Sequence, residues 1–172
     1  MAETALITIA EVQVYRDIDP KINATRFAAY VNELQRKNLR ELLGDALYYD
    51  FMMDARTSGK YADLLNGKTY TYGNQTIQYY GLKPALCYWW LAISAREGES
   101  YHSGYGVINF TNNQQQSFES SKEKERLCAS YMQTAQGYAN DIIKYLNANT
   151  AAYPLWVGDS EKQENQFVTF RI

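Results

Sequence analysis

The stretch CASYMQTAQGYANDIIKY, residues 128–145, decides most about how this chain folds. One set of its residues recurs at alternating spacings of three and four: Cys128, Tyr131, Ala135, Tyr138, Ile142 and Tyr145. This spacing places them on one face of an α-helix, as in the seam of a coiled coil. With its polar flanks, the pattern predicts a helix over about residues 118–147. Such a helix is about 45 Å long and would cross a whole domain of this size.

The same reasoning predicts shorter helices earlier in the chain. Apolar residues at helical spacing indicate helices over about residues 8–15, 24–43, 45–56 and 84–96. Thr8 and Glu11 have the pattern of a capping box at the first of them, and Gly44 marks a stop or bend between the second and the third. The helix over residues 84–96 is expected to be the most buried. Residues 97–113 are rich in glycine and are predicted to form a long loop.

Residues 68–80 carry the clearest β-strand signal. The segments KTYTY and QTIQYY flank Gly73-Asn74, and glycine in the first place of a two-residue loop favours a type II′ hairpin turn. In that register Tyr70 faces Ile77 and Lys68 faces Tyr79. One face of the hairpin then carries four candidate protein-interface residues: Tyr70, Tyr72, Ile77 and Tyr79. Because a lone hairpin is marginally stable in water, this face must pack on a helix or on a neighbouring subunit.

The last residues read as a polar linker followed by an apolar segment. Residues 159–165 are polar and charged, and residues 167–172 read FVTFRI. This segment either packs back on its own domain or adds a strand to the sheet edge of another subunit. We therefore divide the chain into a helical domain, 1–158, with its hairpin at 68–80, and a C-terminal docking tail, 159–172. The tail adds four candidate interface residues: Phe167, Val168, Phe170 and Ile172.

The predicted fold class is therefore mainly α: a bundle of four to five helices with one β-hairpin insertion and an extended tail. The chain has 172 residues, a formal net charge of −2 and 16 tyrosines. The charge argues against a dedicated nucleic-acid binder, which normally has a basic face. Tyrosine offers a large contact area with a polar tip, which suits protein interfaces. We expect no signal peptide, and the longest apolar stretch, residues 85–93, is far shorter than a membrane span of about 20 residues.

Residues suited to catalysis or metal binding are few. His102 is the single histidine, and no motif places it beside a nucleophile and an orienting acid. Cys87 and Cys128 have no metal-ligand spacing and read as small buried hydrophobic residues. Asp50 and Asp54 share a helix face at i,i+4, but they read as acids on the outer surface. We expect no catalytic site, no metal site and no cofactor.

A series of stretches spread over the chain points to a known family. They are LRELLGDALYY (39–49), GLKPALCYWW (81–90), GVINF (106–110), IKYLN (143–147) and the pair Tyr153-Pro154. In this order they resemble the helical head–tail connector, or adaptor, proteins of tailed bacteriophages, in particular those of Bacteroides-infecting and crAss-like phages. The resemblance covers about residues 6–156.

The resemblance implies a helical bundle that assembles into a closed ring, commonly twelvefold, with no enzymatic activity. Such a ring lies beneath the portal and extends the DNA channel toward the tail. The implied partners are other copies of the chain, the portal protein and neighbouring connector or tail proteins, with DNA passing through without specific binding. The implied location is the virion, after synthesis in the host bacterial cytoplasm. The tyrosine-rich hairpin departs from shorter connectors, so the surface that meets each neighbour stays open.

Two other classes of function remain open. A small non-enzymatic binding or regulatory module would use the hairpin as its recognition edge. An enzyme would need a site that no motif indicates, and the pair Asp50 and Asp54 is the place to test for one.

Overall fold

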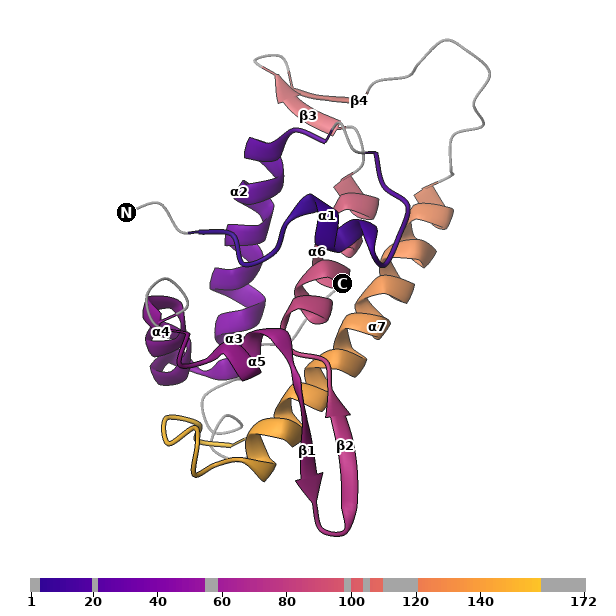
Figure 1. The fold of residues 1–172 in the computed structure, drawn as a ribbon. Coiled ribbons are helices and arrows are strands. Elements are labelled where there is room, and N and C mark those ends of the chain that lie inside the picture. The colour runs from indigo at the N-terminus through magenta and orange to yellow at the C-terminus, as the bar shows by residue number, and fades with distance from the viewer. Residues whose placement is uncertain are drawn as a thin grey trace.

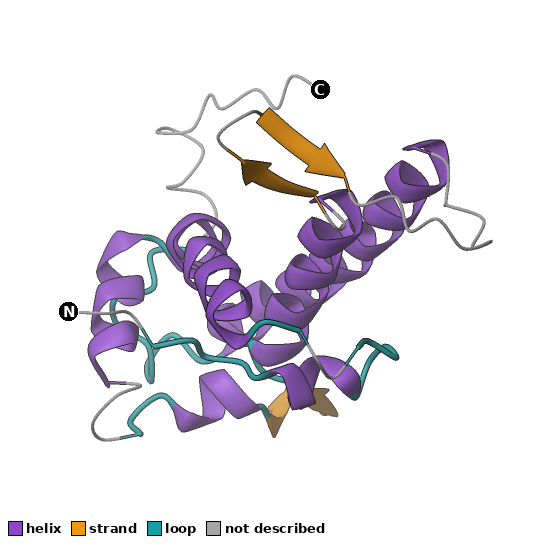
Figure 2. Ribbon diagram, turned by 90° about the horizontal axis from the view of Figure 1, so that it is seen from above, coloured by secondary structure: helices purple, strands orange, loops and turns teal. Residues whose placement is uncertain are grey.

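The structure is a computed structural model that describes residues 4–19, 22–54, 59–97, 100–103, 106–109 and 121–158. The chain is mainly helical, with two antiparallel hairpins at opposite ends of the helical body (Figures 1 and 2). The helices are α1 (Ile9–Gln13), α2 (Ala24–Leu34), α3 (Arg40–Leu43), α4 (Asp45–Asp54), α5 (Ala62–Asn66), α6 (Lys83–Glu97) and α7 (Ser121–Ala148), with a π-helical segment, η1 (Gln35–Leu39), between α2 and α3. The strands are β1 (Lys68–Tyr72), β2 (Gln75–Tyr79), β3 (Ser100–Ser103) and β4 (Gly106–Asn109). The predicted mainly α class with its tyrosine-rich hairpin is confirmed.

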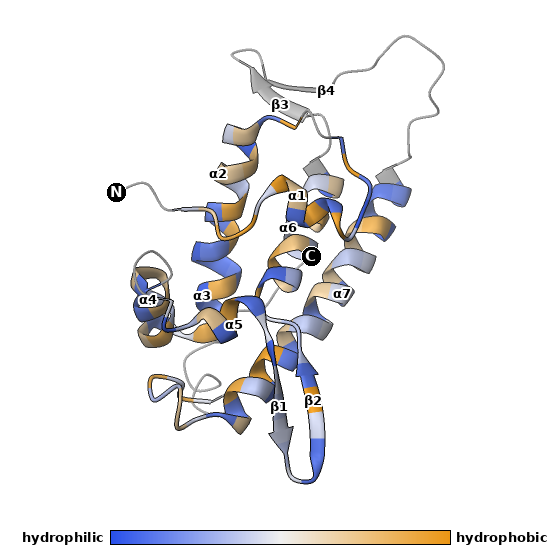
Figure 3. Ribbon diagram, viewed as in Figure 1, coloured by the Kyte–Doolittle hydropathy of each residue, from blue (hydrophilic) through white to orange (hydrophobic). Residues whose placement is uncertain are grey.

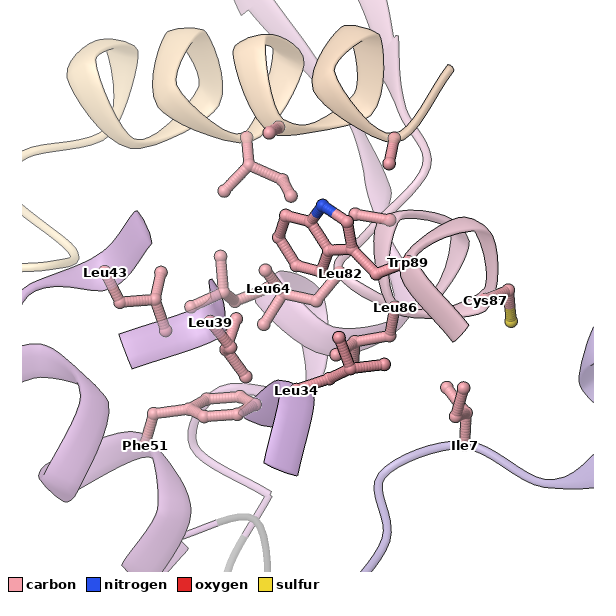
Figure 4. Packing of buried hydrophobic residues seen from close by; sticks show 14 of the residues in the cluster. Ile7, Leu34, Leu39, Leu43, Phe51, Leu64, Leu82, Leu86, Cys87 and Trp89 are labelled. Atoms are coloured by element: carbon pink, nitrogen blue, oxygen red, sulfur yellow. The ribbon is translucent and has the colours of Figure 1, made fainter. Parts of the chain in front are cut away.

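Helix α6 is the centre of the fold. Every side chain from Ala85 to Leu91 is buried, which is the pattern of a helix covered on all sides. Helix α2 covers it through Phe27, whose ring centroid lies 5.0 Å from that of Trp90. Helix α1 is joined to it by an ion pair of 2.8 Å between Lys83 and Glu11. The prediction that this helix is the most buried is therefore confirmed, and Figure 4 shows Leu34, Leu64 and Leu82 pointing into the shared interior.

Helix α7 lies along α6 and carries the seam seen in the sequence. Ala135, Ile142 and Tyr145 are buried, whereas Tyr131 and Tyr138 are half-buried. Figure 3 shows hydrophobic and hydrophilic positions alternating along this helix, as an amphipathic helix requires. Its 28 residues span about 42 Å at 1.5 Å per residue. The first predicted residues, 118–120, lie outside the described part of the chain.

The β1–β2 hairpin has the predicted register. Lys68 pairs with Tyr79 and Tyr70 pairs with Ile77. Gly73 opens the two-residue turn with a φ of +59°, a conformation that favours glycine. Tyr70, Ile77 and Tyr79 are half-buried or buried, while the opposite face of both strands is exposed. One face therefore packs and the other faces solvent, as the alternation predicted.

Three features differ from the sequence-based expectations. Residues 97–113 are not a plain loop, because β3 and β4 pair antiparallel within them. The short helix α5 follows Tyr61 and was not anticipated. The predicted helix over residues 24–43 is interrupted by η1, where Gln35 is fully buried. Its amide accepts a hydrogen bond of 2.7 Å from the Leu6 N–H and donates one of 3.2 Å to the Thr4 carbonyl, so this segment anchors the chain that precedes α1.

Candidate protein interface

The inner face of the β1–β2 hairpin packs on helix α7 of the same chain. The ring of Tyr79 stacks on that of Tyr145 with centroids 4.0 Å apart, and Tyr70 meets Tyr145 edge-on at 5.2 Å. The Tyr79 hydroxyl donates a hydrogen bond of 2.9 Å to the Leu64 carbonyl, and burial raises the pKa of this phenol well above its usual value. The hairpin is thus secured inside its own chain by stacking and by a satisfied buried hydroxyl.

This packing divides the predicted hairpin interface. Tyr79 is 2% exposed and belongs to the core, so its assignment as an interface residue is corrected. Tyr70 and Ile77 are half-buried. Tyr72, near the turn, is 64% exposed and keeps its place as a candidate contact residue. The four tail candidates, Phe167, Val168, Phe170 and Ile172, lie outside the described residues.

A second tyrosine cluster joins α1, α6 and α7. The Tyr88 ring stacks on Tyr138 at 5.8 Å and lies 5.5 Å from Tyr15. The Arg16 guanidinium lies over both Tyr88 and Tyr131, at 5.7 and 5.6 Å from the ring centroids, which adds cation–π attraction. Burial raises the pKa of Tyr15 to about 12. Many of the tyrosines therefore make contacts within the chain.

Helix α4 presents apolar side chains on two opposite faces. It buries Leu47, Tyr48, Phe51 and Met52. On the other side, Ala46 is exposed, Tyr49 is 54% exposed and Met53 is 68% exposed. Residues at these spacings of three and four form one stripe along a helix, which we call the α4 stripe. Sequence reasoning missed it, although the signal was present: the residues behind the buried face of this helix also have helical spacing.

Charged side chains border the α4 stripe at one end. Arg40 and Asp45 form an ion pair of 2.8 Å, and the hydrogen bond from Arg40 holds the pKa of the Asp45 carboxyl below its usual range. The same guanidinium lies 5.4 Å from the ring centroid of Tyr49. The stripe is therefore apolar at its centre with a polar rim, as protein interfaces commonly are.

The carboxylates of Asp50 and Asp54 both anchor the residues that follow the helix. Asp50 pairs with Lys60 at 2.8 Å and accepts a hydrogen bond from the Tyr61 hydroxyl. The hydrogen bond from Lys60 lowers the pKa of Asp50. Asp54 accepts a hydrogen bond of 2.9 Å from the Tyr61 N–H and is only 8% exposed, so the expectation that it lies on the outer surface is corrected. Both carboxylates therefore hold Lys60 and Tyr61 against α4, which is a structural role.

Other candidate residues fall as follows. Cys87 is buried and Cys128 is half-buried, and both are free thiols; burial raises the pKa of Cys87 to about 12. His102 lies in β3. Within the described residues, no three or more His, Cys, Asp or Glu side chains gather as metal ligands could. No helix in that part of the chain has the length and apolar character needed to span a bilayer.

Taken together, the fold and its exposed residues define a small helical protein with an apolar stripe on one peripheral helix. The chain belongs to DUF6712, a family of unknown function. The model of this family matches residues 39–166. The match begins at the last residue of η1 and so includes the α4 stripe, the β1–β2 hairpin, α6 and α7. No curated protein and no solved structure matches the chain.

Proposed function

We propose that this chain is a structural virion protein that forms a ring in the head–tail connector of a tailed bacteriophage, beneath the portal, where it extends the DNA channel and joins the capsid to the tail. The resemblance of residues 39–49, 81–90 and 143–147 to connector proteins supports the proposal. In the structure these residues form α3, the first half of α4, the first half of α6 and the end of α7, which are elements that build the bundle.

The observation that carries the proposal is the α4 stripe. A helix that is apolar on both sides is normally covered on both sides, but in the described part of the chain Tyr49 and Met53 of α4 stay 54% and 68% exposed. Figure 1 places α4 at the periphery of the body, away from α7. This exposed side of α4 can therefore meet another molecule without rearrangement of the fold.

A closed ring of identical subunits needs two different patches that fit each other on every subunit. The α4 stripe is one. For the other we propose the outer part of the β1–β2 hairpin, where Tyr72 and Tyr80 are 64% and 59% exposed. A two-stranded sheet also leaves one edge of each strand unpaired, and such edges accept further strands. In the assembled connector, residues 159–172 dock on the portal or on an adjoining component.

The charge of the chain is compatible with a channel through which DNA moves. A formal net charge of −2 offers phosphates no strong attraction, so passing DNA is not held. The protein is then made in the cytoplasm of the host bacterium and ends in the virion.

Light scattering of the purified chain, alone and with portal protein, tests the proposal. We expect a ring, or assembly on the portal, that is lost when Tyr49→Ser and Met53→Ser are combined. The matched control is Val14→Ser, because Val14 is 79% exposed beside α1 and lies outside both patches. A chain that stays monomeric and ignores the portal contradicts the proposal.

A second candidate function is a small protein-binding or regulatory module that uses the hairpin. The exposure of Tyr72 and the unpaired strand edges favour it, since an extended peptide can add to such an edge. In that case Tyr72→Ala abolishes partner binding while the combined changes at Tyr49 and Met53 have no effect.

A further inference from the structure

A groove crosses the side of the bundle where α2, η1 and α3 face α6 and α7. Its volume is about 270 Å³. Its apolar lining includes Leu34 from α2, Trp89 and Ile93 from α6, and Cys128 and Met132 from α7. Met132 is 42% exposed although it sits in the seam region of α7. An engineered apolar cavity of about 150 Å³ binds one benzene molecule, so this groove has room for one aromatic side chain together with smaller aliphatic ones.

We infer that, in the unassembled subunit, this groove binds residues 166–172 of the same chain. The inference goes beyond the ring proposed above and does not depend on it. Three properties of the molecule support this occupant: the length of the groove, the reach of the linker and the charges on the groove rim.

The length of the groove matches an extended apolar segment. Along α6 the groove runs from Trp89 to Arg96, which is about 10 Å at 1.5 Å per residue. In an extended chain Val168, Phe170 and Ile172 point to the same side and span about 13 Å. Three apolar side chains can then face a floor made of Leu34, Trp89 and Ile93, while the backbone stays at the rim.

The linker is long enough to bring this segment to the groove. The described chain leaves the body beside Trp156, whose indole N–H donates a hydrogen bond of 2.8 Å to the Asn147 side chain. From Asn147 back to Met132 is about 22 Å along α7, and the two positions lie within about 60° of each other around the helix. The linker, residues 159–165, spans at most about 24 Å when extended. The reach therefore fits the distance within one chain.

The groove rim carries both acidic and basic side chains, and the tail segment brings one basic side chain. Glu33 and Glu41 lie on the rim, with Lys37 and Arg96. Residues 166–172 carry one charge, on Arg171. In the extended segment Arg171 points away from the apolar floor, and its long side chain can reach the carboxylates of the rim. The polar linker has the composition of a segment that stays in solvent.

Disulfide trapping tests the inference, because the native Cys128 lies in the groove. In full-length Val168→Cys protein under a mild oxidant, we expect a disulfide between residues 128 and 168 inside one chain, seen as a linked peptide by mass spectrometry and as a monomer band without reductant. A short linker gives an effective concentration of the order of 1 mM, so at about 10 μM protein pairing within a chain exceeds pairing between chains about a hundredfold. Cys87 is buried and takes no part.

The control moves the thiol to a nearby site outside the groove. The triple variant Cys128→Ser, Asn140→Cys, Val168→Cys places it on the exposed Asn140, which is closer to Asn147 along α7. If the tail has no binding site, the cysteine at position 168 forms a disulfide with position 140 at least as fast as with position 128. That result overturns the inference. A disulfide formed mainly between chains overturns it as well, because it assigns the groove to a second copy.

A second measurement needs no added cysteine. The rate at which a maleimide labels Cys128 should rise about tenfold or more when Phe170→Ser and Ile172→Ser are combined, since the tail no longer shields the thiol; tenfold corresponds to about 1.4 kcal/mol of lost shielding. The control is Thr169→Ser, because Thr169 points away from the groove in the extended segment. This substitution should leave the labelling rate of Cys128 unchanged. Equal labelling of all three proteins contradicts docking. Ring formation is scored separately by light scattering, so either proposal can fail alone.

Discussion

The ring of Tyr79 stacks on that of Tyr145 at a centroid distance of 4.0 Å and an interplanar angle of 8°. The two residues come from the hairpin and from the long helix, 66 positions apart in the sequence. Around them, the Tyr145 hydroxyl lies 3.0 Å from that of Tyr153. This contact makes the hairpin part of the core and leaves only its outer portion for partners.

Replacing Tyr79 with alanine is therefore expected to destabilise the fold by about 3–5 kcal/mol, as for other buried aromatic residues. Tyr72→Ala removes an exposed ring on the same strand pair and should change the free energy of unfolding by less than about 0.5 kcal/mol. Urea denaturation measures both. Equal losses for the two variants contradict the assignment of Tyr79 to the core.

Gln35→Leu should loosen the chain before α1. The substitution keeps the volume but removes the acceptor for the Leu6 N–H and the donor for the Thr4 carbonyl. An unsatisfied group of this kind costs about 1–3 kcal/mol. Hydrogen exchange at residues 4–8 should accelerate, whereas the exposed control Gln133→Leu leaves it unchanged. Unaltered protection in the Gln35 variant would show that these bonds do not hold the segment.

The ion pair between Glu11 and Lys83 gives a defined dependence on pH. Partial burial alone raises the pKa of Glu11, but hydrogen bonds from Lys83 and Thr8 outweigh it and set the pKa below its ordinary value of 4.5. A carboxyl whose pKa is lowered by folding stabilises the fold above that unfolded value, and this contribution is lost as the pH falls through the folded pKa.

Glu11→Gln tests that dependence, because glutamine keeps the capping box with Thr8 and loses the charge. Both side chains of the pair are about one-third exposed, so the difference from the unsubstituted protein should be at most about 1 kcal/mol at pH 7. It should shrink below pH 4.5. A difference in the free energy of unfolding that is constant from pH 7 to pH 3 contradicts the ion pair.

Alanine substitutions at two glycines should change stability in opposite directions, because the fold requires glycine at one position and not at the other. Gly81 has a φ of +87°, and an added Cβ would collide with the Leu65 carbonyl oxygen. Gly81→Ala should therefore cost more than about 2 kcal/mol, from the unfavourable φ and the clash together. Gly137 lies inside α7 with open space around it, and Gly137→Ala should stabilise by about 0.5–1 kcal/mol. Thermal unfolding of both variants checks these opposite signs.

The long helix, the hairpin register and the buried central helix could be predicted because each is specified by local periodicity. Tyr131, Tyr138 and Tyr145 recur at helical spacing, and Gly73 marks a two-residue turn between two strands of alternating pattern. The π-helical segment at Gln35 could not be predicted in this way. Gln35 makes its contact there with Leu6, which lies 29 residues earlier in the chain. No local sequence pattern predicts such a contact.

The candidate interface was predicted only in part, because exposure is a property of the whole fold. Tyr72 and Tyr79 have the same residue type and the same face of the hairpin, yet one is exposed and the other is covered by α7. The α4 stripe was visible as a second apolar face, but its significance depends on which side of α4 the core covers. The groove likewise arises only when α2, α6 and α7 come together.

The proposed connector works through contacts of the chain with copies of itself and with virion components. The mass in solution of the purified chain, with and without portal protein, decides whether those contacts exist. We expect a closed assembly of about twelve copies, formed alone or on the portal, that falls to monomers when Tyr49→Ser and Met53→Ser are combined and survives Val14→Ser. A monomer that is indifferent to the portal at every concentration tested would contradict it.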